Sequence, residues 1–286
     1  MNGALLVDKP AGVTSFDVVA IVRRALGIKS VGHTGTLDPF ATGLLVVLTG
    51  KATRLSRFLD VFEKEYAATV RFGQSSSTDD PEGVLTPALP GPPPRELEPV
   101  EVAAALDGFT RRYAQVPPDY SAKKIDGQRA YARARKGEEV VLKAVDVTIN
   151  WGKLRSFEWP DARIDVSVST GTYVRALARD LGEKLGVPAH CAELRRTRIG
   201  EFEVADAQTL EALQQGQVTG RLSMLELVPH LPKQLLDDVA LAHVRHGRRV
   251  PTTETKGPIA LVHAGELIAI AEVDDGLLQP TVVLAE

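Results

Sequence analysis

Cysteine is nearly absent from this chain of 286 residues, which contains only Cys191. A single cysteine excludes an internal disulfide, and with it a secreted fold held together by disulfides. No group of Cys and His has zinc-ligand spacing, so a structural zinc site is not expected. The sequence also lacks an apolar run long enough to span a bilayer and a basic stretch leading into one near Met1. We therefore expect a globular cytoplasmic protein without a membrane span.

Neither sign of charge predominates in the chain as a whole. Its 34 Lys and Arg oppose 37 Asp and Glu, so the formal net charge of −3 does not indicate a polyanionic partner. Residues 123–136, KKIDGQRAYARARK, are a local exception with six basic side chains and one acid. Helical spacing there would place Arg129, Arg133 and Lys136 on one side of a helix. Because salt screens distant charges, this patch and a smaller basic cluster at residues 195–198 suit phosphate binding.

Apolar periodicity predicts helices and strands interspersed along the chain. Ser15 stands where the cap of the first helix is expected, and Gly27 where that helix ends. Dense prolines at 84–99 predict a surface connection, and the Gly- and Thr-rich stretch 31–43 is expected to be irregular. The predicted strands are 4–10, 44–50, 65–73, 147–154 and 162–171, and the predicted helices are 15–27, 51–62, 100–109 and 173–186.

The C-terminal part differs in pattern from the rest. From about Leu235, short apolar runs are separated by Ala264-Gly265 and Asp275-Gly276, which are hairpin signals. So small a unit buries too little surface to be stable alone, so we expect it to dock against the larger part. The sequence therefore predicts two domains, residues 1–232 and a compact β-rich domain at residues 233–286.

The loop GHTGTLDPFATG places one carboxylate, Asp38, between glycines and beside a predicted buried strand. Loops held between ordered elements often carry reactive groups. A plainer interpretation is that Asp38 caps a turn or short helix, with Pro39 in the next position. Composition alone favours the cap.

Six segments of the sequence resemble the TruB-type tRNA pseudouridine-55 synthases, in the order that this family shows, and together they cover nearly the whole chain. The longest, VGHTGTLDPFATGLLVVLTGKATRL, contains Asp38 and resembles the catalytic motif without a gap. The resemblance implies an α/β (α+β) chain with a mixed, largely antiparallel sheet flanked by helices, and a short PUA-like RNA-binding domain at the C-terminus. The other segments are VDKPAGVTSFDVV, EKEYAATVRFG, PPDYSAKKIDGQRAYARARKG, STGTYVRALARDLG and ELRRTRIGEF.

The same resemblance implies that the protein isomerises uridine 55 in the T loop of transfer RNA to pseudouridine. The reaction breaks the glycosidic bond, turns the bound base and joins its carbon 5 to the ribose, without a redox step. A stacked uridine is inaccessible, so the enzyme is expected to flip it out of the RNA. No organic cofactor and no metal are expected, in agreement with the absence of GxxxxGK[ST] and HExxH motifs. The expected partner is the T arm of transfer RNA, bound by a monomer without an obligatory protein partner.

The resemblance also assigns roles to particular residues. Asp38 is the nucleophilic aspartate, Tyr66 packs on the target base and Arg175 pairs with Asp38. His33 stands near the displaced nucleotide. Judged from the residues alone, a strand tyrosine is more often a core aromatic, and His33 is equally well a turn histidine bonded to the backbone.

Further contacts to RNA are expected around these residues. Tyr173 offers a second ring face, and Leu194 an apolar wall of the base pocket, both by similarity. Exposed charges on a helix are usually only solvated, but the basic patch as a whole favours contact with RNA. The residues expected at phosphates are Lys9, Lys124, Arg129 and Arg133.

Asp38 must be ionised to act, yet a pocket that excludes water raises the pKa of a carboxyl. A guanidinium stays protonated and can pair with a carboxylate through two hydrogen bonds. We therefore expect Arg175 to keep Asp38 both charged and aimed. Whether Asp38 attacks the ribose, adds to the base or removes a ribose proton stays open.

A few positions depart from the family pattern. Ser76 and Ser77 stand where Thr and Asp are more frequent, Arg111 where glycine is frequent, and Lys123 where leucine is usual. The first two departures suggest that a contact supporting the site differs here. The other two positions are not expected to carry the reaction.

Three other functions stay open. An RNA-binding module or chaperone would grip a folded transfer RNA, and assist its folding, without using Asp38; it could coexist with the enzyme. A sister enzyme would act in a guide-RNA complex on ribosomal RNA, although such relatives usually have longer flanks and a fuller tail. A glycosidase-like hydrolase needs paired carboxylates, and the sequence shows no second acid in a comparable loop.

Overall fold

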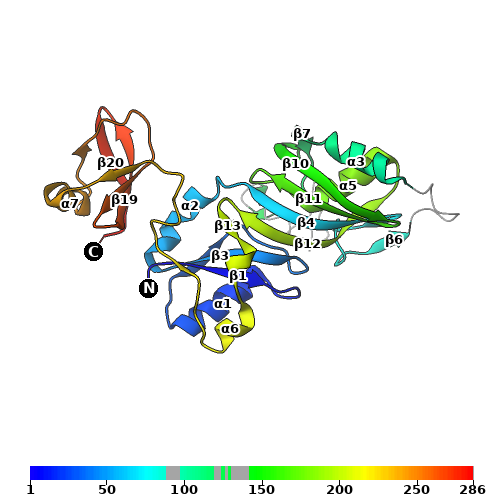
Figure 1. Ribbon diagram of the computed structural model, residues 1–286, viewed down its shortest axis with the longest axis horizontal. Coiled ribbons are helices and arrows are strands. Elements are labelled where there is room, and N and C mark those ends of the chain that lie inside the picture. Colours follow the sequence, from blue (N-terminus) through cyan, green and yellow to red (C-terminus); the bar gives the residue numbers. More distant parts are fainter. Residues whose placement is uncertain (88–96, 119–123, 126–127, 130–141, 286) are drawn as a thin grey trace.

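The computed structural model describes residues 1–87, 97–118, 124–125, 128–129 and 142–285. It contains an 11-stranded sheet, a five-stranded sheet near the C-terminus and two sheets of two strands each. The five-stranded sheet lies at one end of an elongated molecule (Figure 1). Helices α3 (Pro99–Asp107) and α5 (Val174–Leu185) lie at the other end. The mixed α+β class expected from the sequence is confirmed.

The large sheet is mixed, with mostly antiparallel neighbours. Its main path is β14-β1-β3-β12-β4-β11-β10-β7, and β2, β13 and β15 pair with β3, β12 and β1. The pairs β1–β14 and β3–β12 are parallel. The strands are β1 (Gly3–Lys9), β2 (Val31–Thr34), β3 (Thr42–Thr49), β4 (Lys64–Phe72), β7 (Arg111–Gln115), β10 (Val145–Glu158), β11 (Asp161–Val168), β12 (Ala189–Ile199), β13 (Phe202–Glu203), β14 (Gln208–Thr209) and β15 (Arg221–Leu222).

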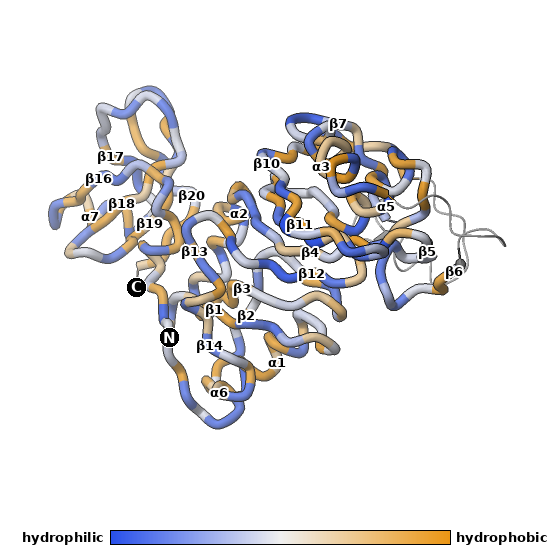
Figure 2. Tube along the Cα trace, turned by 45° about the vertical axis from the view of Figure 1, so that its right-hand side comes forward, coloured by the Kyte–Doolittle hydropathy of each residue, from blue (hydrophilic) through white to orange (hydrophobic). Residues whose placement is uncertain are grey.

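Helices cover the large sheet in two places. α1 (Ser15–Leu26) and α6 (Leu210–Gln214) pack on β1 and β3, where Val18, Val22 and Leu213 are fully buried. α3 and α5 pack on β4, β10 and β11, and Leu177 and Leu181 of α5 are fully buried there. Apolar residues are visible along α1 and α3 in Figure 2. The first turn of α5 is thereby held against the centre of the sheet.

The cap of α1 differs from the prediction by one residue. Thr14 is the N-cap: its hydroxyl accepts the N–H of Asp17 at 3.1 Å, and the Thr14 N–H donates to the Asp17 carboxylate at 2.8 Å. This reciprocal box satisfies two backbone donors at the helix start. Ser15 is buried instead, and its side chain forms hydrogen bonds with the backbone of Leu37.

Two segments between α1 and β4 also differ from the sequence prediction. β2 lies within residues 31–43, which we expected to be irregular, because its backbone pairs with β3. The predicted helix 51–62 is two shorter pieces, the 3₁₀ helix η1 (Gly50–Leu55) and α2 (Ser56–Leu59). Neither piece has a side-chain cap.

The five-stranded sheet follows the order β16-β18-β19-β20-β17. Both predicted hairpins are confirmed, since Ala264-Gly265 and Asp275-Gly276 join its central strands and all four residues have positive φ, the geometry of type I′ turns. The sheet docks as expected, with Leu267, Ile270 and Val282 in one cluster with Leu44 and Val46 of β3. The elements of this C-terminal part are β16 (Lys233–Leu235), α7 (Asp238–Arg245), β17 (Val250–Pro251), β18 (Ile259–His263), β19 (Glu266–Asp274) and β20 (Leu277–Val283), and η2 (Val204–Asp206) precedes β14 of the large sheet.

Arg111, where the resemblance led us to expect glycine, has a φ of 85°. A side chain in this left-handed region costs about 1–2 kcal/mol relative to the right-handed one. Glycine adopts it freely, so the departure is a local cost at the start of β7, away from the chemistry. Among the described residues, no helix has the length and apolar character needed to cross a membrane.

Candidate active site

A cavity of about 250 Å³ lies where the N-terminus of α5 meets β4 and β12. Its wall combines acids, cations, two tyrosine rings and two leucines. The fold thus gathers parts of the chain that are far apart in sequence. Five of the residues singled out from the sequence line this cavity: Asp38, Tyr66, Tyr173, Arg175 and Leu194.

The loop that carries Asp38 is held on both sides by hydrogen bonds. The Ser15 hydroxyl donates to the carbonyl of Leu37 at 3.1 Å and accepts the Leu37 N–H at 2.9 Å. The Gly12 N–H donates to the Pro39 carbonyl at 2.9 Å. With its backbone anchored in this way, Asp38 presents a side chain that is 36% exposed to the cavity.

Lys9, which we expected at an RNA phosphate, instead supports this loop from inside. Its side chain is fully buried, and its Nζ donates to the carbonyls of Pro10, Val13 and Pro39 at 3.0, 2.8 and 3.2 Å. Burial lowers the pKa of Lys9 to about 8. An ammonium whose three donors are occupied by carbonyls has none left for a phosphate, so this prediction is wrong.

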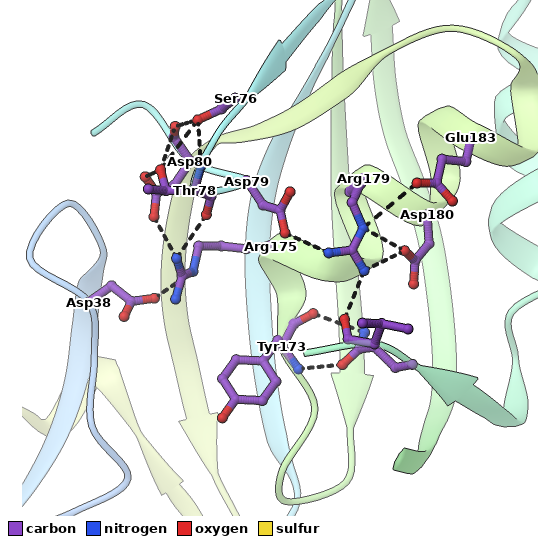
Figure 3. Close-up of polar contacts among 12 residues, drawn as sticks. Asp38, Ser76, Thr78, Asp79, Asp80, Tyr173, Arg175, Arg179, Asp180 and Glu183 are labelled. Atoms are coloured by element: carbon purple, nitrogen blue, oxygen red, sulfur yellow. Dashed lines mark hydrogen bonds and ion pairs between the residues drawn. The ribbon is translucent and has the colours of Figure 1, made fainter. Parts of the chain in front are cut away.

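Arg175 projects from the first turn of α5 into the cavity and is 4% exposed (Figure 3). Its Nε pairs with the Asp38 carboxylate at 2.9 Å, which confirms the expected pair. Its Nη1 pairs with the Asp80 carboxylate at 2.8 Å and donates to the Thr78 carbonyl at 2.9 Å. The sequence suggested a guanidinium fork on Asp38 alone, whereas the structure places the guanidinium between two carboxylates. The Asp38 side chain thus faces a cation rather than capping a turn.

Burial raises the pKa of Asp38 above the ordinary value of an aspartate. The Arg175 charge opposes this rise in pKa, and the neighbouring charge of Asp80 adds to it. Arg175 therefore limits the rise without cancelling it, which corrects the expectation that it simply keeps Asp38 charged. The ionised form of Asp38 is therefore lost as pH falls through this raised pKa.

Asp80 is a second acid that the sequence did not lead us to expect. It is 3% exposed and lies between β5 (Gln74–Ser76) and β6 (Leu85–Pro87). Its carboxylate accepts the N–H of Glu82 at 3.0 Å and the hydroxyl of Thr78. The expectation of no second acid is therefore wrong. Since one guanidinium pairs with both carboxylates, the arrangement differs from the separate acid and base of a glycosidase.

The two serine departures both hold the loop that carries Asp80. The Ser76 hydroxyl donates to the Asp80 carbonyl. The Ser77 hydroxyl accepts the N–H of Val84 at 2.9 Å. The two serine hydroxyls thus close the loop that carries Asp80. Despite the departures from the family pattern, Asp80 still pairs with Arg175.

The aromatic and apolar side chains enter the cavity from three directions. Tyr66 is 8% exposed on β4, between Val166 of β11 and Arg196 of β12. Leu194, also 8% exposed, lies on β12, and Tyr173 immediately precedes α5. These positions suit a flat base held between rings and a leucine, and the individual roles stay predictions.

His33 lies on β2, outside the residues that line the cavity. Its ring packs edge-to-face on Phe16, with centroids 5.5 Å apart. Its Nδ1 is buried and has no hydrogen-bond partner in the described part of the chain. Burial, and then the charge of Arg196, lower the pKa of His33, which favours the neutral ring. Its contact with a displaced nucleotide stays a prediction.

Two cations in the cavity wall were missed as site residues. Arg196 is 1% exposed and donates to the carbonyls of Leu44 at 2.8 Å and Gly35 at 2.7 Å. Lys64 donates to the Phe62 carbonyl at 3.1 Å. Burial, and then the Arg196 charge, lower the pKa of Lys64 to about 8. Arg196 thus holds the backbone at Gly35, close to Asp38 in sequence, and both residues add positive charge to the cavity.

The basic cluster expected at residues 195–198 does not form a free phosphate-binding surface. Arg195 pairs with Asp8 at 2.7 Å, and Arg198 approaches Glu65 at 3.7 Å. The two-residue period of a strand could have identified Arg196 as a cavity residue, because Leu194 and Arg196 lie on the same face of β12 and both line the cavity.

The larger basic segment is only partly described. Arg129 lies in β9 (Gln128–Arg129), which pairs with β8 (Lys124–Ile125), so its predicted place on a helix is wrong. Arg133 and Lys136 lie outside the described residues. Within the described ranges, no group of three or more His, Cys, Asp or Glu side chains is placed to hold a metal ion.

Comparison with known proteins gives a consistent result over the whole chain. Residues 23–174 match the model for the TruB family pseudouridylate synthase N-terminal domain, and residues 175–239 match the tRNA pseudouridylate synthase B C-terminal domain. A tRNA pseudouridine synthase B of Thermobifida fusca is 45% identical, with 99% of each chain covered. One of Mycobacteroides abscessus is 40% identical, covering 99% of this chain and 95% of the relative.

Solved structures agree with the sequence comparison. The chain in the crystal structure of a Cbf5-Nop10-Gar1 complex has a TM-score of 0.75 and is 26% identical, covering 99% of this chain and 84% of that chain. The two matched family models meet inside the site, between Val174 and Arg175. With the fold, the cavity and the matches in agreement, the chain belongs to the TruB family and is a pseudouridine synthase.

Proposed function

We propose that this enzyme isomerises uridine 55 in the T loop of transfer RNA, with Asp38 as the essential carboxylate. The observation that carries the proposal is the ion pair between Asp38 and Arg175, at 2.9 Å, in the wall of a cavity of about 250 Å³. Support for the substrate comes from the relatives, which are named tRNA pseudouridine synthase B and are 40–45% identical over 99% of this chain.

The chemistry suits these side chains. The isomerisation breaks the bond between ribose C1′ and N1 and forms one between C1′ and carbon 5, while carbon 5 loses its proton and N1 gains one. No electrons are gained or lost, so a positioned carboxylate can act as nucleophile or base without an electron carrier. Arg175 orients Asp38, and the Tyr66 ring offers a surface on which the loose uracil can turn. Unstacking the uridine from its neighbours costs a few kcal/mol, which contacts to the flipped nucleotide would offset.

RNA binding would extend beyond the cavity. Residues 123–136 carry six basic side chains, and residues 233–286 form the small domain that we propose to be PUA-like and to touch RNA. The division at residues 232 and 233 is part of this proposal, because the five-stranded sheet begins at Lys233. We propose further that a monomer suffices, without an obligatory protein partner, and that binding the T arm assists folding of the RNA.

A second candidate is modification inside a guide-RNA assembly. The Cbf5 chain has the same fold, and its crystal structure is that of a complex with Nop10 and Gar1. Such an enzyme would require added guide RNA and partner proteins. Activity of the isolated chain on transfer RNA separates the two candidates.

The experiment is to incubate unmodified transfer RNA with the purified protein alone and to map pseudouridine by nucleotide position. We expect one modified position, uridine 55, without added metal or cofactor. A transcript with cytidine at this position is the matched control and should stay unmodified. Modification elsewhere, or only after guide RNA is added, would remove the proposed substrate.

A further inference from the structure

Gln115 is the last residue of β7 and is fully buried beside the cavity. Its side-chain Oε1 accepts the N–H of Tyr173 at 2.9 Å, and its Nε2 donates to the Tyr173 carbonyl at 3.1 Å. Nε2 also donates to the Tyr113 hydroxyl. One amide therefore grips both backbone groups of one residue, as a neighbouring strand would. Figure 3 shows Tyr173 with the two hydrogen bonds made by its backbone N–H and carbonyl.

The gripped residue is the one that precedes α5. Tyr173 is the N-cap of this helix, and its side chain makes no capping bond. A helix start without a side-chain cap takes its position from other contacts. One turn further on, Arg179 Nη2 donates to the carbonyl of Val116, the residue after Gln115, at 2.8 Å. The end of β7 is thus attached to both of the first two turns of α5.

Two functional side chains depend on where α5 begins. The Tyr173 ring and the Arg175 guanidinium, two residues apart, both line the cavity. Arg175 must reach Asp38 with Nε and Asp80 with Nη1 at the same time, at 2.9 and 2.8 Å. A small shift of the helix start would break this double contact, because charge-assisted hydrogen bonds weaken steeply with distance and angle.

We propose that Gln115 is a positioning residue for the isomerisation, which acts through the backbone of Tyr173 to hold the Tyr173 ring and the Arg175 guanidinium in register with Asp38. It does not touch the substrate. The inference rests on the proposed role of Asp38, and it adds a contact from a strand on the far edge of the sheet. The amide is needed because an apolar side chain of equal size fills the space but holds neither backbone group.

Gln115→Met tests the proposal by keeping the size and removing the grip. We expect kcat on transfer RNA to fall by about 10- to 100-fold, the scale of a misplacement near 1 Å, with KM within about threefold. The acid limb of the kcat profile should also move to higher pH, because a displaced Arg175 opposes the raised pKa of Asp38 less.

Gln208→Met is the matched control. Gln208 is 6% exposed on β14 and accepts the Thr219 N–H at 3.0 Å, on the opposite edge of the sheet. It should lower the melting temperature without changing kcat or the pH profile. If Gln115→Met behaves like this control, Gln115 is only structural and the proposal is overturned.

Gln115→Glu decides the matter should the methionine variant not fold. A protonated glutamic acid has the shape of glutamine and can donate to the Tyr173 carbonyl, whereas the ionised form cannot. Asp38 still titrates in this variant, so the informative quantity is the ratio of its kcat to that of the wild type at each pH. We expect this ratio to be near one at acid pH and to fall as the introduced carboxyl ionises with rising pH. A profile parallel to the wild type would overturn the proposal. Conversion that survives in Asp38→Asn would instead defeat the proposed function, so the two failures are distinct.

Discussion

Asp38→Asn should reduce the conversion of uridine to pseudouridine by at least about 10⁴-fold, the scale on which removal of a nucleophile acts. The amide has nearly the same shape as the carboxylate, but it carries no charge and can serve neither as nucleophile nor as base. RNA affinity should change by less than about threefold, because binding energy comes from many other contacts. Single-turnover conversion and equilibrium RNA binding measure the two effects separately.

Asp60→Asn is the control for Asp38. Asp60 lines the same cavity, and its carboxylate accepts the Thr34 hydroxyl at 3.0 Å. Its replacement removes a negative charge from the cavity without touching Arg175. We expect conversion within about tenfold of the wild type, the modest effect of a charge outside the reaction path. Equal losses in both variants would show that cavity charge, rather than Asp38 itself, is what the reaction needs.

Arg175→Lys is expected to have the next largest effect. Lysine keeps the positive charge but presents a point charge in place of a planar fork, so it cannot satisfy Asp38 and Asp80 together. We expect a loss of about 100-fold in kcat from misaligned Asp38. We also expect a lower melting temperature, because breaking a buried ion pair costs about 3–5 kcal/mol when one charge is left unpaired.

Arg179→Lys separates alignment from stability. Arg179 lies one turn along α5 and pairs with Asp79 and Asp180, each at 2.8 Å, outside the cavity lining. Its replacement should lower the melting temperature by a similar amount while kcat falls less than in Arg175→Lys, because Gln115 still holds the Tyr173 backbone at the start of α5. The assignment of Arg175 as the residue that aims Asp38 would be refuted by equal kcat losses in the two variants.

The sequence predicted those parts of the fold that depend on local pattern. The hairpins at Ala264-Gly265 and Asp275-Gly276 were found because a type I′ turn has two residues with positive φ, which favours glycine in the second position. The end of α1 at Gly27 was found because glycine also adopts a positive φ without strain. Asp38 and Arg175 were found by resemblance to a family, not by any physical signal in their own segments. Their residue spacing does not reveal that they meet.

What the sequence did not predict depends on tertiary burial. Lys9 ends a strand and looks exposed, yet the loop around Pro39 folds over it and turns its ammonium inward. Asp80 and Gln115 are ordinary polar residues in sequence, and their importance comes from partners near α5, 95 and 58 residues away. Long-range pairs of this kind leave no periodic pattern, because nothing local distinguishes them from solvated side chains.

The pH dependence of the single-turnover rate tests the central claim most directly, because it reports the ionisation of the reacting group in place. If Asp38 acts as an anion in a site where burial raises its pKa against the pull of Arg175, the rate should fall with decreasing pH, with a midpoint above the ordinary value of an aspartate. That midpoint should move upward in Arg175→Met, which removes the opposing charge. A rate that does not fall with acid, or a midpoint unchanged by the loss of Arg175, would contradict an anionic Asp38 governed by its arginine neighbour.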